Sequence, residues 1–200
     1  ELFSLSHDEI QASHEKLLKH PSIRECAILS TCNRTEIYTT VTDTKQGLTA
    51  IKDFFRDFKG IDYDAYRPHV FSLLHEDAVL HLFRVASGLD SLILGEGQIL
   101  GQIKDTLHQA RKHKASGMML DKAFKSALTI GKRVRTEPGI ATKDLSISKA
   151  AYDYVKALDT SCLDKNIAVL GGGSMAALLM QSLREDVTSC LLYTSDAADE

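Results

Sequence analysis

The stretch IRECAILSTCNRTEIYTTV, residues 23–41, decides the fold of the first part of this chain. Its first eight residues, 23–30, contain an apolar run that favours a buried strand. Residues 34–41 are rich in β-branched and aromatic types, which favours a second strand. Only the polar connection Thr31-Cys32-Asn33 separates them. The sequence therefore predicts two neighbouring strands that hold a thiol at a surface edge between them.

Helical patterns surround this strand pair. Ser6 and Glu9 form a capping-box signature, and the helical stripe that follows ends at Pro21. Further helices are predicted over 45–58, 76–87, 97–114, 119–136 and 146–159, with a loop over 59–68. A short buried strand at 167–170 runs into a glycine-rich turn and an apolar helix over 177–183. The fold class is thus an α+β domain over 1–140, a connecting helix within 141–162, and the first βα unit of a Rossmann-like α/β domain over 163–200.

Composition narrows the class of protein. The 200 residues are 44% hydrophobic and 26% charged, with a formal net charge of −3, as in an ordinary soluble protein. No apolar run is long enough to span a membrane, and no signal peptide is visible. The four cysteines have no metal-ligand or disulfide spacing, so we expect reduced thiols, a cytoplasmic location and no metal site. The chain does not begin with Met, and we expect it to be a fragment.

The charge is unevenly distributed. Residues 101–135 carry nine Lys and Arg against two acids, a balance of +7, whereas the rest of the chain carries fifteen against twenty-five, a balance of −10. Such a block suggests a polyanionic partner. The alternative is a solvated helical surface without a partner.

Cys32 is the first candidate for chemistry. Its neighbours Thr31, Asn33 and Arg34 are all polar, and Arg34 could lower the pKa of the thiol or hold an anionic substrate group. A lone cysteine often serves only as a small apolar residue, and Cys26, inside the apolar strand, fits that interpretation. For Cys32 both interpretations stay open on the residues alone.

A second candidate is the pattern Gly171-x-Gly173-x-x-Ala176, which follows a strand and opens a helix. This is the context of a dinucleotide-binding turn, although another kind of βα turn could also contain it. A third is the segment 90–102, where Ser91, Glu96, Gln98 and Gln102 interrupt an apolar run. A bound polar substrate is one explanation; helix capping by Ser91 or Glu96 is the other, and these residues alone favour it. A lone histidine such as His81, beside an apolar stripe, is more often a partly buried core residue than a catalyst.

Three motifs carry a resemblance to a known family. Residues 30–38 (STCNRTEIY), 82–104 (LFRVASGLDSLILGEGQILGQIK) and 131–137 (GKRVRTE) resemble glutamyl-tRNA reductase, in the order that family has them. The resemblance runs from residue 1 to about 185. It implies NADPH-dependent reduction of glutamyl-tRNA(Glu) to glutamate-1-semialdehyde through a cysteine thioester, the first step of porphyrin (tetrapyrrole) biosynthesis.

The resemblance also assigns roles to residues. It makes Cys32 the nucleophile and His81 a residue important for activity, and it makes 1–140 the catalytic, glutamyl-tRNA-binding domain. The substrate contacts it implies are Thr31, Cys32, Asn33, Arg34, Ser91, Glu96, Gly97, Gln98 and Gln102, with Arg34 pairing a carboxylate. The NADPH-binding residues it implies are Gly171, Gly172, Gly173, Ser174, Met175 and Ala176.

The chain departs from the family pattern at both ends. The family has an additional strand before residue 1, and residues 187–200 match its next strand poorly, so we expect a non-native tail. The full-length family forms homodimers through a C-terminal domain absent here. The resemblance suggests the glutamate-1-semialdehyde aminomutase as a partner, and plastid stroma as the location in a photosynthetic eukaryote.

Two other functions stay open. One is a tRNA-independent acyl-thioester reductase, which would leave the basic helices and the Asn33-Arg34 pair unexplained. The other is a non-catalytic tRNA- or partner-binding relative, in which replacing Cys32 by Ser would change no measurable property.

Overall fold

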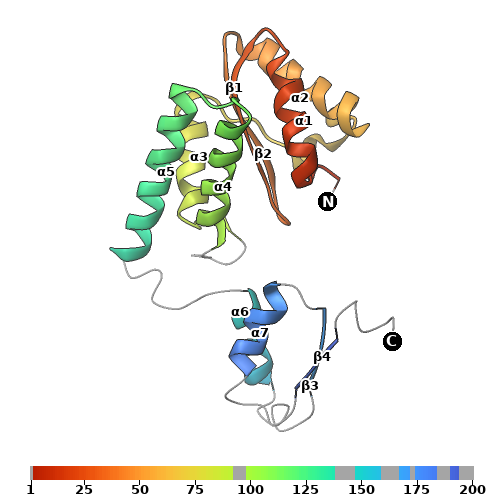
Figure 1. Ribbon diagram of the computed structural model, residues 1–200, viewed down its shortest axis with the longest axis vertical. Coiled ribbons are helices and arrows are strands. Elements are labelled where there is room, and N and C mark those ends of the chain that lie inside the picture. The colour runs from red at the N-terminus through yellow and green to blue at the C-terminus, as the bar shows by residue number, and fades with distance from the viewer. Residues whose placement is uncertain are drawn as a thin grey trace. The chain divides into compact units, whose positions relative to one another are not determined.

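The computed structural model describes residues 2–91, 98–137, 147–158, 167–171, 174–183 and 190–193. These residues fall into two compact units. The larger unit contains most of residues 2–137, and the smaller unit contains the described residues from 147 onward (Figure 1). Each unit is described by itself.

Among its described residues, the larger unit contains five α-helices, one 3-10 helix and a pair of strands. Their bounds are α1 His7–Leu18, β1 Ile23–Ser30, β2 Thr35–Val41, α2 Thr44–Lys59, the 3-10 helix η1 Tyr63–His69, α3 His75–Ala86, α4 Gln98–Lys112 and α5 Met118–Thr136. The smaller unit contains α6 Ile147–Leu158, β3 Ile167–Leu170, α7 Ser174–Leu183 and β4 Cys190–Tyr193. The prediction of a loop over residues 59–68 is wrong, because Tyr63–His69 form η1, with Asp62 capping its first turn.

The β1–β2 ribbon is covered on both faces. The strands pair antiparallel, from Ile23 opposite Val41 to Ser30 opposite Thr35. Ala27 and Leu29 enter an apolar cluster with α3, α4 and α5, whereas Cys26 and Ile28 enter a second cluster with α1 and α2. Because successive side chains of a strand point to opposite faces, the ribbon lies between these two groups of helices (Figure 1). This explains why the apolar run of β1 is continuous rather than alternating.

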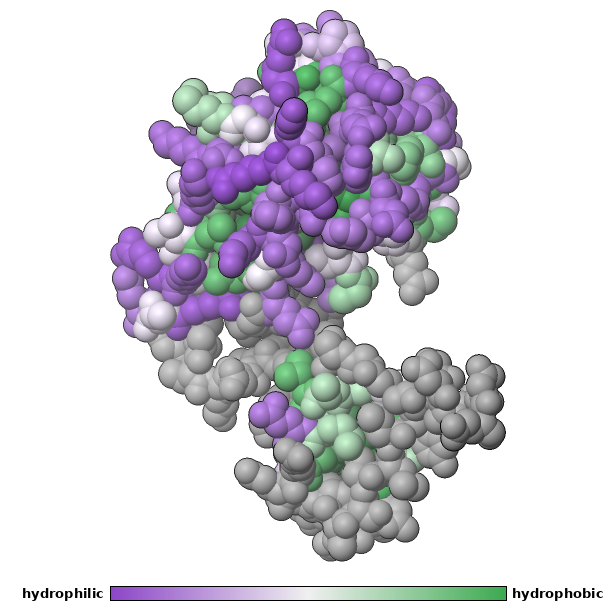
Figure 2. Space-filling model, in the orientation of Figure 1, coloured by the Kyte–Doolittle hydropathy of each residue, from purple (hydrophilic) through white to green (hydrophobic). Residues whose placement is uncertain are grey.

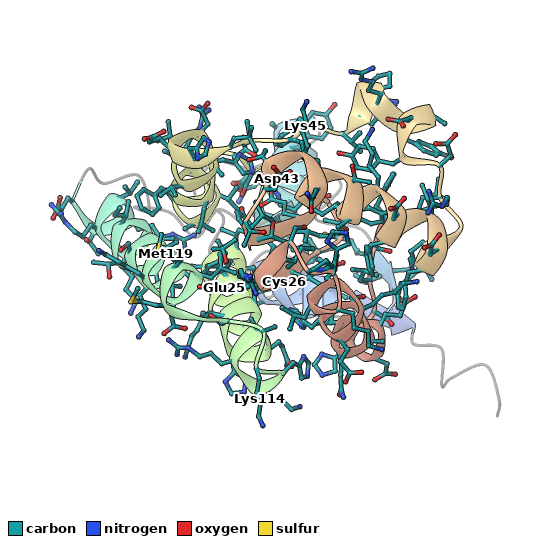
Figure 3. All side chains as sticks on the ribbon, turned by 90° about the horizontal axis from the view of Figure 1, so that it is seen from above. Glu25, Cys26, Asp43, Lys45, Lys114 and Met119 are labelled. Atoms are coloured by element: carbon teal, nitrogen blue, oxygen red, sulfur yellow. The ribbon has the colours of Figure 1, made fainter. Side chains whose placement is uncertain are left out.

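Glu25, on β1, fixes the start of α5. Its carboxylate accepts hydrogen bonds from the backbone N–H groups of Met119, at 3.2 Å, and Leu120, at 2.7 Å. These are two of the N–H groups that a helix leaves without a partner at its first turn. Figure 3 labels Glu25 and Met119. The Cys26 N–H also donates to the Ala115 carbonyl at 2.8 Å. The α4–α5 connection is thereby attached to the central strand.

Helices α3 and α5 approach each other closely at Gly131. A Cβ atom on Gly131 would lie 2.5 Å from the carbonyl oxygen of Ala86 and 2.9 Å from the Leu100 side chain. Only glycine fits there without a shift of the α3 backbone. This close contact places the last turn of α3, and the residues after it, at a defined position beside α5.

The smaller unit contains a parallel pair of strands. β3 pairs with β4 from Ile167 opposite Cys190 to Leu170 opposite Tyr193, and α7 lies between them in the chain. A parallel pair joined through a helix is a βαβ arrangement. Tyr152 of α6, Val169 and Leu183 share a small buried cluster. The expected non-native tail thus contributes a strand at 190–193.

Hydrophilic side chains cover most of the visible face of the larger unit, with smaller hydrophobic patches between them (Figure 2). Among the helices that the structure describes, none combines the length and apolar character that crossing a membrane requires.

Candidate active site

Thr31 shapes the short turn between β1 and β2. Its N–H donates to the Arg34 carbonyl at 2.8 Å, and its hydroxyl oxygen accepts from the N–H groups of Asn33 and Arg34, each at 3.2 Å. A threonine hydroxyl that bonds the backbone in this way replaces part of the strand ladder and stabilises a tight turn. Hydrogen bonds between Thr31 and other residues of the turn therefore stabilise its conformation.

Cys32 lies exposed on this turn, whereas Cys26 is fully buried in the ribbon. Burial raises the pKa of the Cys26 thiol well above its usual range, so that thiol stays protonated and inert. The structure confirms the core interpretation for Cys26. In contrast, the Cys32 thiol is accessible to a substrate from solution.

Arg34 is held by two carboxylates. Its Nη1 lies 3.0 Å from Glu36 Oε1 and 2.9 Å from Asp90 Oδ2, and its Nη2 donates to the backbone carbonyl of Asp90. The side chains of Arg34 and Glu36 are 18% and 14% exposed, whereas that of Asp90 is 37% exposed. Arg34, which the family resemblance assigns to a substrate carboxylate, is thus already paired within the protein.

Glu36 is the centre of this network. Its Oε1 lies 2.9 Å from His81 Nε2, and its Oε2 accepts from the Tyr38 hydroxyl. Burial raises the pKa of Glu36, but the hydrogen bonds from His81 and Tyr38 and the charge of Arg34 outweigh it, and the net shift is downward. Glu36 is therefore ionised, and the pKa of Tyr38 is raised by burial and by that carboxylate.

Glu36, Tyr38 and Asp90 were not predicted as site residues. The period of a strand offered a signal for two of them, because positions 36 and 38 lie on one face of β2 and Arg34, just before the strand, continues the same alternation. No such signal existed for Asp90, which reaches Arg34 from 56 positions away. His81 also packs edge-on against Phe71, with ring centroids 5.4 Å apart.

The other predicted site residues lie further along the chain. Ser91, directly after Asp90, is half-buried. In the first turns of α4, Gln98 is exposed and Gln102 is half-buried. Glu96, Gly97, Gly172 and Gly173 lie outside the described residues. The roles of these residues as substrate or cofactor contacts remain predictions.

The predicted nucleotide turn lies between β3 and α7. Gly171 has φ +99°, a backbone conformation that side-chain-bearing residues rarely adopt, and nothing lies within 4 Å of where its Cβ would be. Helix α7 begins at Ser174, and Ala176 is half-buried near its start. Glycine is therefore favoured at position 171 because of its backbone conformation, and not because a side chain would clash there.

Part of the basic block is neutralised locally. Arg111 and Lys125 both pair with Asp121, at 2.5 and 3.0 Å, and Arg133 pairs with Glu137 at 3.0 Å. A shallow pocket of about 340 Å³ over α5 is lined by Met118, Asp121, Lys122, Lys125 and Ser126 and includes no predicted site residue. Exposed lysines without a described acidic partner lie on the same helices: Lys104, Lys112, Lys122 and Lys132.

Among the described residues, no group of three or more His, Cys, Asp or Glu could hold a metal ion.

The chain is similar to known proteins of one family. A family model described as glutamyl-tRNA(Glu) reductase, N-terminal domain, matches residues 1–138. The glutamyl-tRNA reductase of Microcystis aeruginosa is 46% identical over 183 residues, which is 92% of this chain and 43% of that protein. The glutamyl-tRNA reductase of Gloeothece citriformis is 47% identical over 177 residues, 86% of this chain and 41% of that protein. The solved structure of glutamyl-tRNA reductase from Methanopyrus kandleri matches with a TM-score of 0.55 and 27% identity, over 96% of this chain and 48% of that one.

The chain has a mixed helix and strand fold with an exposed thiol on a short turn, and reductases match it along most of its length. It therefore belongs to a family of oxidoreductases. That family is glutamyl-tRNA reductase, and the chain belongs to it. The resemblance inferred from the three motifs is thereby confirmed. The chain spans less than half the length of the curated relatives it matches.

Proposed function

We propose that the protein to which this chain belongs reduces glutamyl-tRNA to glutamate-1-semialdehyde, and that Cys32 is its nucleophile. The observation that carries the proposal is the exposed Cys32 thiol on a turn braced by Thr31, two residues from the ionic network of Arg34. A nucleophile needs access to the substrate and a fixed position, and this turn provides both.

The proposed first step transfers the glutamyl group to Cys32. The thiolate sulfur attacks the carbonyl carbon of the aminoacyl ester, a C–S bond forms, and the bond from that carbon to the ribose oxygen breaks. The ribose oxygen takes up the proton that the Cys32 thiol lost on forming the thiolate, so the tRNA leaves with a free hydroxyl group, and a thioester remains on the protein. Since a thioester is more electrophilic than an ester, this exchange prepares the carbonyl for reduction.

Arg34 and His81 have supporting roles in the proposal. Arg34 would pair with a carboxylate of the glutamyl group, through N–H groups that its protein partners leave available. His81 lies beside the same network, and its Nε2 is engaged by the Glu36 carboxylate. The nitrogen that remains for contact with the substrate is Nδ1.

The β3–α7 turn fits a dinucleotide. The positive φ of Gly171, the parallel strand pair and the start of α7 directly after the turn are features that a pyrophosphate-binding turn needs. Gly171 to Ala176 would hold the cofactor, and a Rossmann-like domain would continue from this βαβ arrangement. NADPH, when bound, supplies the hydride that converts the thioester into the aldehyde and releases the Cys32 thiolate.

The basic helices α4 and α5 are suited to bind the tRNA part of the substrate. The net charge of +7 over residues 101–135 would attract the phosphate backbone of tRNA, and exposed Lys104, Lys112 and Lys132 are available for it. Such an attraction weakens as the salt concentration rises.

The proposal is tested by acylation without the cofactor. The chain is mixed with tRNA charged with radiolabelled glutamate, quenched in acid, and assayed for label on the protein. We expect label that hydroxylamine releases, and none on Cys32→Ser. Cys26→Ala, which removes the buried thiol at a cost of about 1–2 kcal/mol in stability, is the matched control and should still be labelled.

Three results would contradict the proposal. Label retained by Cys32→Ser would assign the nucleophile elsewhere. A folded wild-type chain that binds uncharged tRNA but takes up no label would favour the non-catalytic tRNA-binding relative, whereas a chain that is acylated by small glutamyl thioesters but does not bind tRNA would favour the tRNA-independent reductase.

A further inference from the structure

We propose that Asp90 is a positioning residue, which holds the Arg34 guanidinium in the orientation that receives the substrate carboxylate. Asp90 makes two separate contacts with it. Its side-chain Oδ2 lies 2.9 Å from Nη1, and its backbone carbonyl accepts from Nη2. Contacts to two nitrogens of a planar group fix its rotation as well as its position.

Glu36 cannot do this alone. Its Oε1 is shared between Arg34 Nη1 and His81 Nε2, and its Oε2 accepts from Tyr38. Arg34 therefore receives only one contact from Glu36, at Nη1, and a single contact leaves the guanidinium free to rotate about it. Asp90 adds a second carboxylate contact at Nη1, through its side-chain Oδ2, and, through its backbone carbonyl, the contact at Nη2 that Glu36 does not make.

The three acceptors leave a defined part of the guanidinium for a ligand. Arginine has five N–H groups, and within the part of the chain that the structure describes, two on Nη1 and one on Nη2 have partners. The remaining N–H groups, on Nε and Nη2, belong to one edge of the guanidinium. Two parallel N–H groups on one edge match the two oxygens of a carboxylate.

The origin of Asp90 adds to this argument. It follows α3, the helix that also carries His81, and reaches across 56 positions of sequence to β2. The end of α3 is itself held against α5 by the close contact at Gly131. Asp90 thus extends from an anchored part of the larger unit, as a residue that orients another side chain must.

An opposite role for Asp90 makes an opposite prediction. If its carboxylate only occupied the place of the substrate carboxylate, removing it would free Arg34 and improve binding. If it positions Arg34, removing it should weaken binding. The sign of the change in half-saturation therefore decides between the two roles.

The test, which rests on the proposed acylation of Cys32, measures single-turnover acylation of the full chain against glutamyl-tRNA concentration. Asp90→Ala removes the Oδ2 contact at Nη1 and keeps the backbone carbonyl at Nη2. For this variant we expect the half-saturating concentration to rise about tenfold, the worth of the one charge-assisted hydrogen bond that is lost, with little change in the maximal rate. Asp90→Asn, which keeps an acceptor oxygen, should recover most of the loss. Asp64→Ala removes an exposed acid paired with Lys52 and should leave the half-saturation unchanged. An unchanged or lower value for Asp90→Ala overturns the proposal.

A second measurement separates this proposal from the proposed function. In an ¹⁵N-labelled chain, the Arg34 Nη signals, assigned by their loss in Arg34→Lys, should be separate in the wild type because its partners hinder rotation. The two signals should exchange faster in Asp90→Ala, which loses the Oδ2 contact and keeps the backbone carbonyl, but not in Asp64→Ala. An unchanged exchange rate in Asp90→Ala would overturn the positioning role even if Cys32 is acylated, and this result can be obtained even if Cys32 is not.

Discussion

His81 Nε2 lies 2.9 Å from Glu36 Oε1, and both side chains are only 14% exposed. The contact joins α3 to β2 across 45 positions of sequence. Because the pKa of Glu36 is lowered, its carboxylate is ionised and can only accept hydrogen bonds. Nε2 must therefore carry the proton, which leaves Nδ1 as the acceptor nitrogen in the neutral imidazole.

Replacing Glu36 by Gln should destabilise the larger unit. A glutamine has one acceptor oxygen in place of two and brings an NH₂ group against Arg34, His81 or Tyr38. We expect the free energy of unfolding at pH 7 to fall by about 2–3 kcal/mol, measured by urea denaturation. The depressed pKa of Glu36 means that its contribution is present above its unfolded pKa and is lost as the pH falls through its folded pKa. The difference between variant and wild type should therefore shrink in acid.

Glu76→Gln is the matched control, because Glu76 is exposed on α3. It should change the free energy of unfolding by less than about 0.5 kcal/mol. Equal losses from the two substitutions would mean that the network around Glu36 contributes no stability of its own.

The stability of the larger unit should fall with pH below about 6.5, through His14. His14 is fully buried on α1, its Nδ1 lies 3.1 Å from His113 Nδ1, and its Nε2 has no hydrogen-bond partner among the described residues. Burial, and then the charge of His113, lower the pKa of His14 from 6.5 to about 4. Between these values the unfolded chain binds a proton that the folded chain does not, so unfolding is favoured by up to roughly 3 kcal/mol.

The measurement is urea denaturation at several pH values. His14→Gln cannot titrate, and we expect its stability to decline less steeply between pH 6.5 and 4 than that of the wild type. His108→Gln, which removes an exposed histidine of α4, should keep the wild-type slope. Parallel slopes for wild type and His14→Gln would show that other groups cause the decline.

Two glycine-to-alanine substitutions should have opposite effects. At Gly131 the new Cβ would lie 2.5 Å from the Ala86 carbonyl oxygen, a backbone atom that can yield only if α3 moves, and we expect a loss of about 1–3 kcal/mol. At Gly101, on α4, nothing lies within 4 Å, and the higher helix propensity of alanine should add up to about 1 kcal/mol. Thermal unfolding compares the two directly. A neutral result at Gly131 would show that α3 and α5 can separate without cost.

Local patterns predicted most of the elements of the larger unit. The strands at 23–30 and 35–41, the capping box at Ser6 and the helix over 118–136 lie within one or two residues of where the sequence indicated. Capping and periodicity act over a few residues, so a single sequence contains them. The 3-10 helix at 63–69 was missed because Pro68 suggested a break in regular structure, although one turn of this kind can include it.

The sequence by itself determined the two strands, the polar turn that exposes Cys32, and the motifs of the glutamyl-tRNA reductase family. Only the tertiary structure decided what surrounds that turn: which carboxylates pair with Arg34, which nitrogen of His81 is engaged, and how closely α3 lies against α5. The physical reason is that turns and strands follow from neighbours in the chain. The Arg34–Asp90 and Glu36–His81 pairs instead join residues 56 and 45 positions apart, and they exist only once packing has brought their elements together.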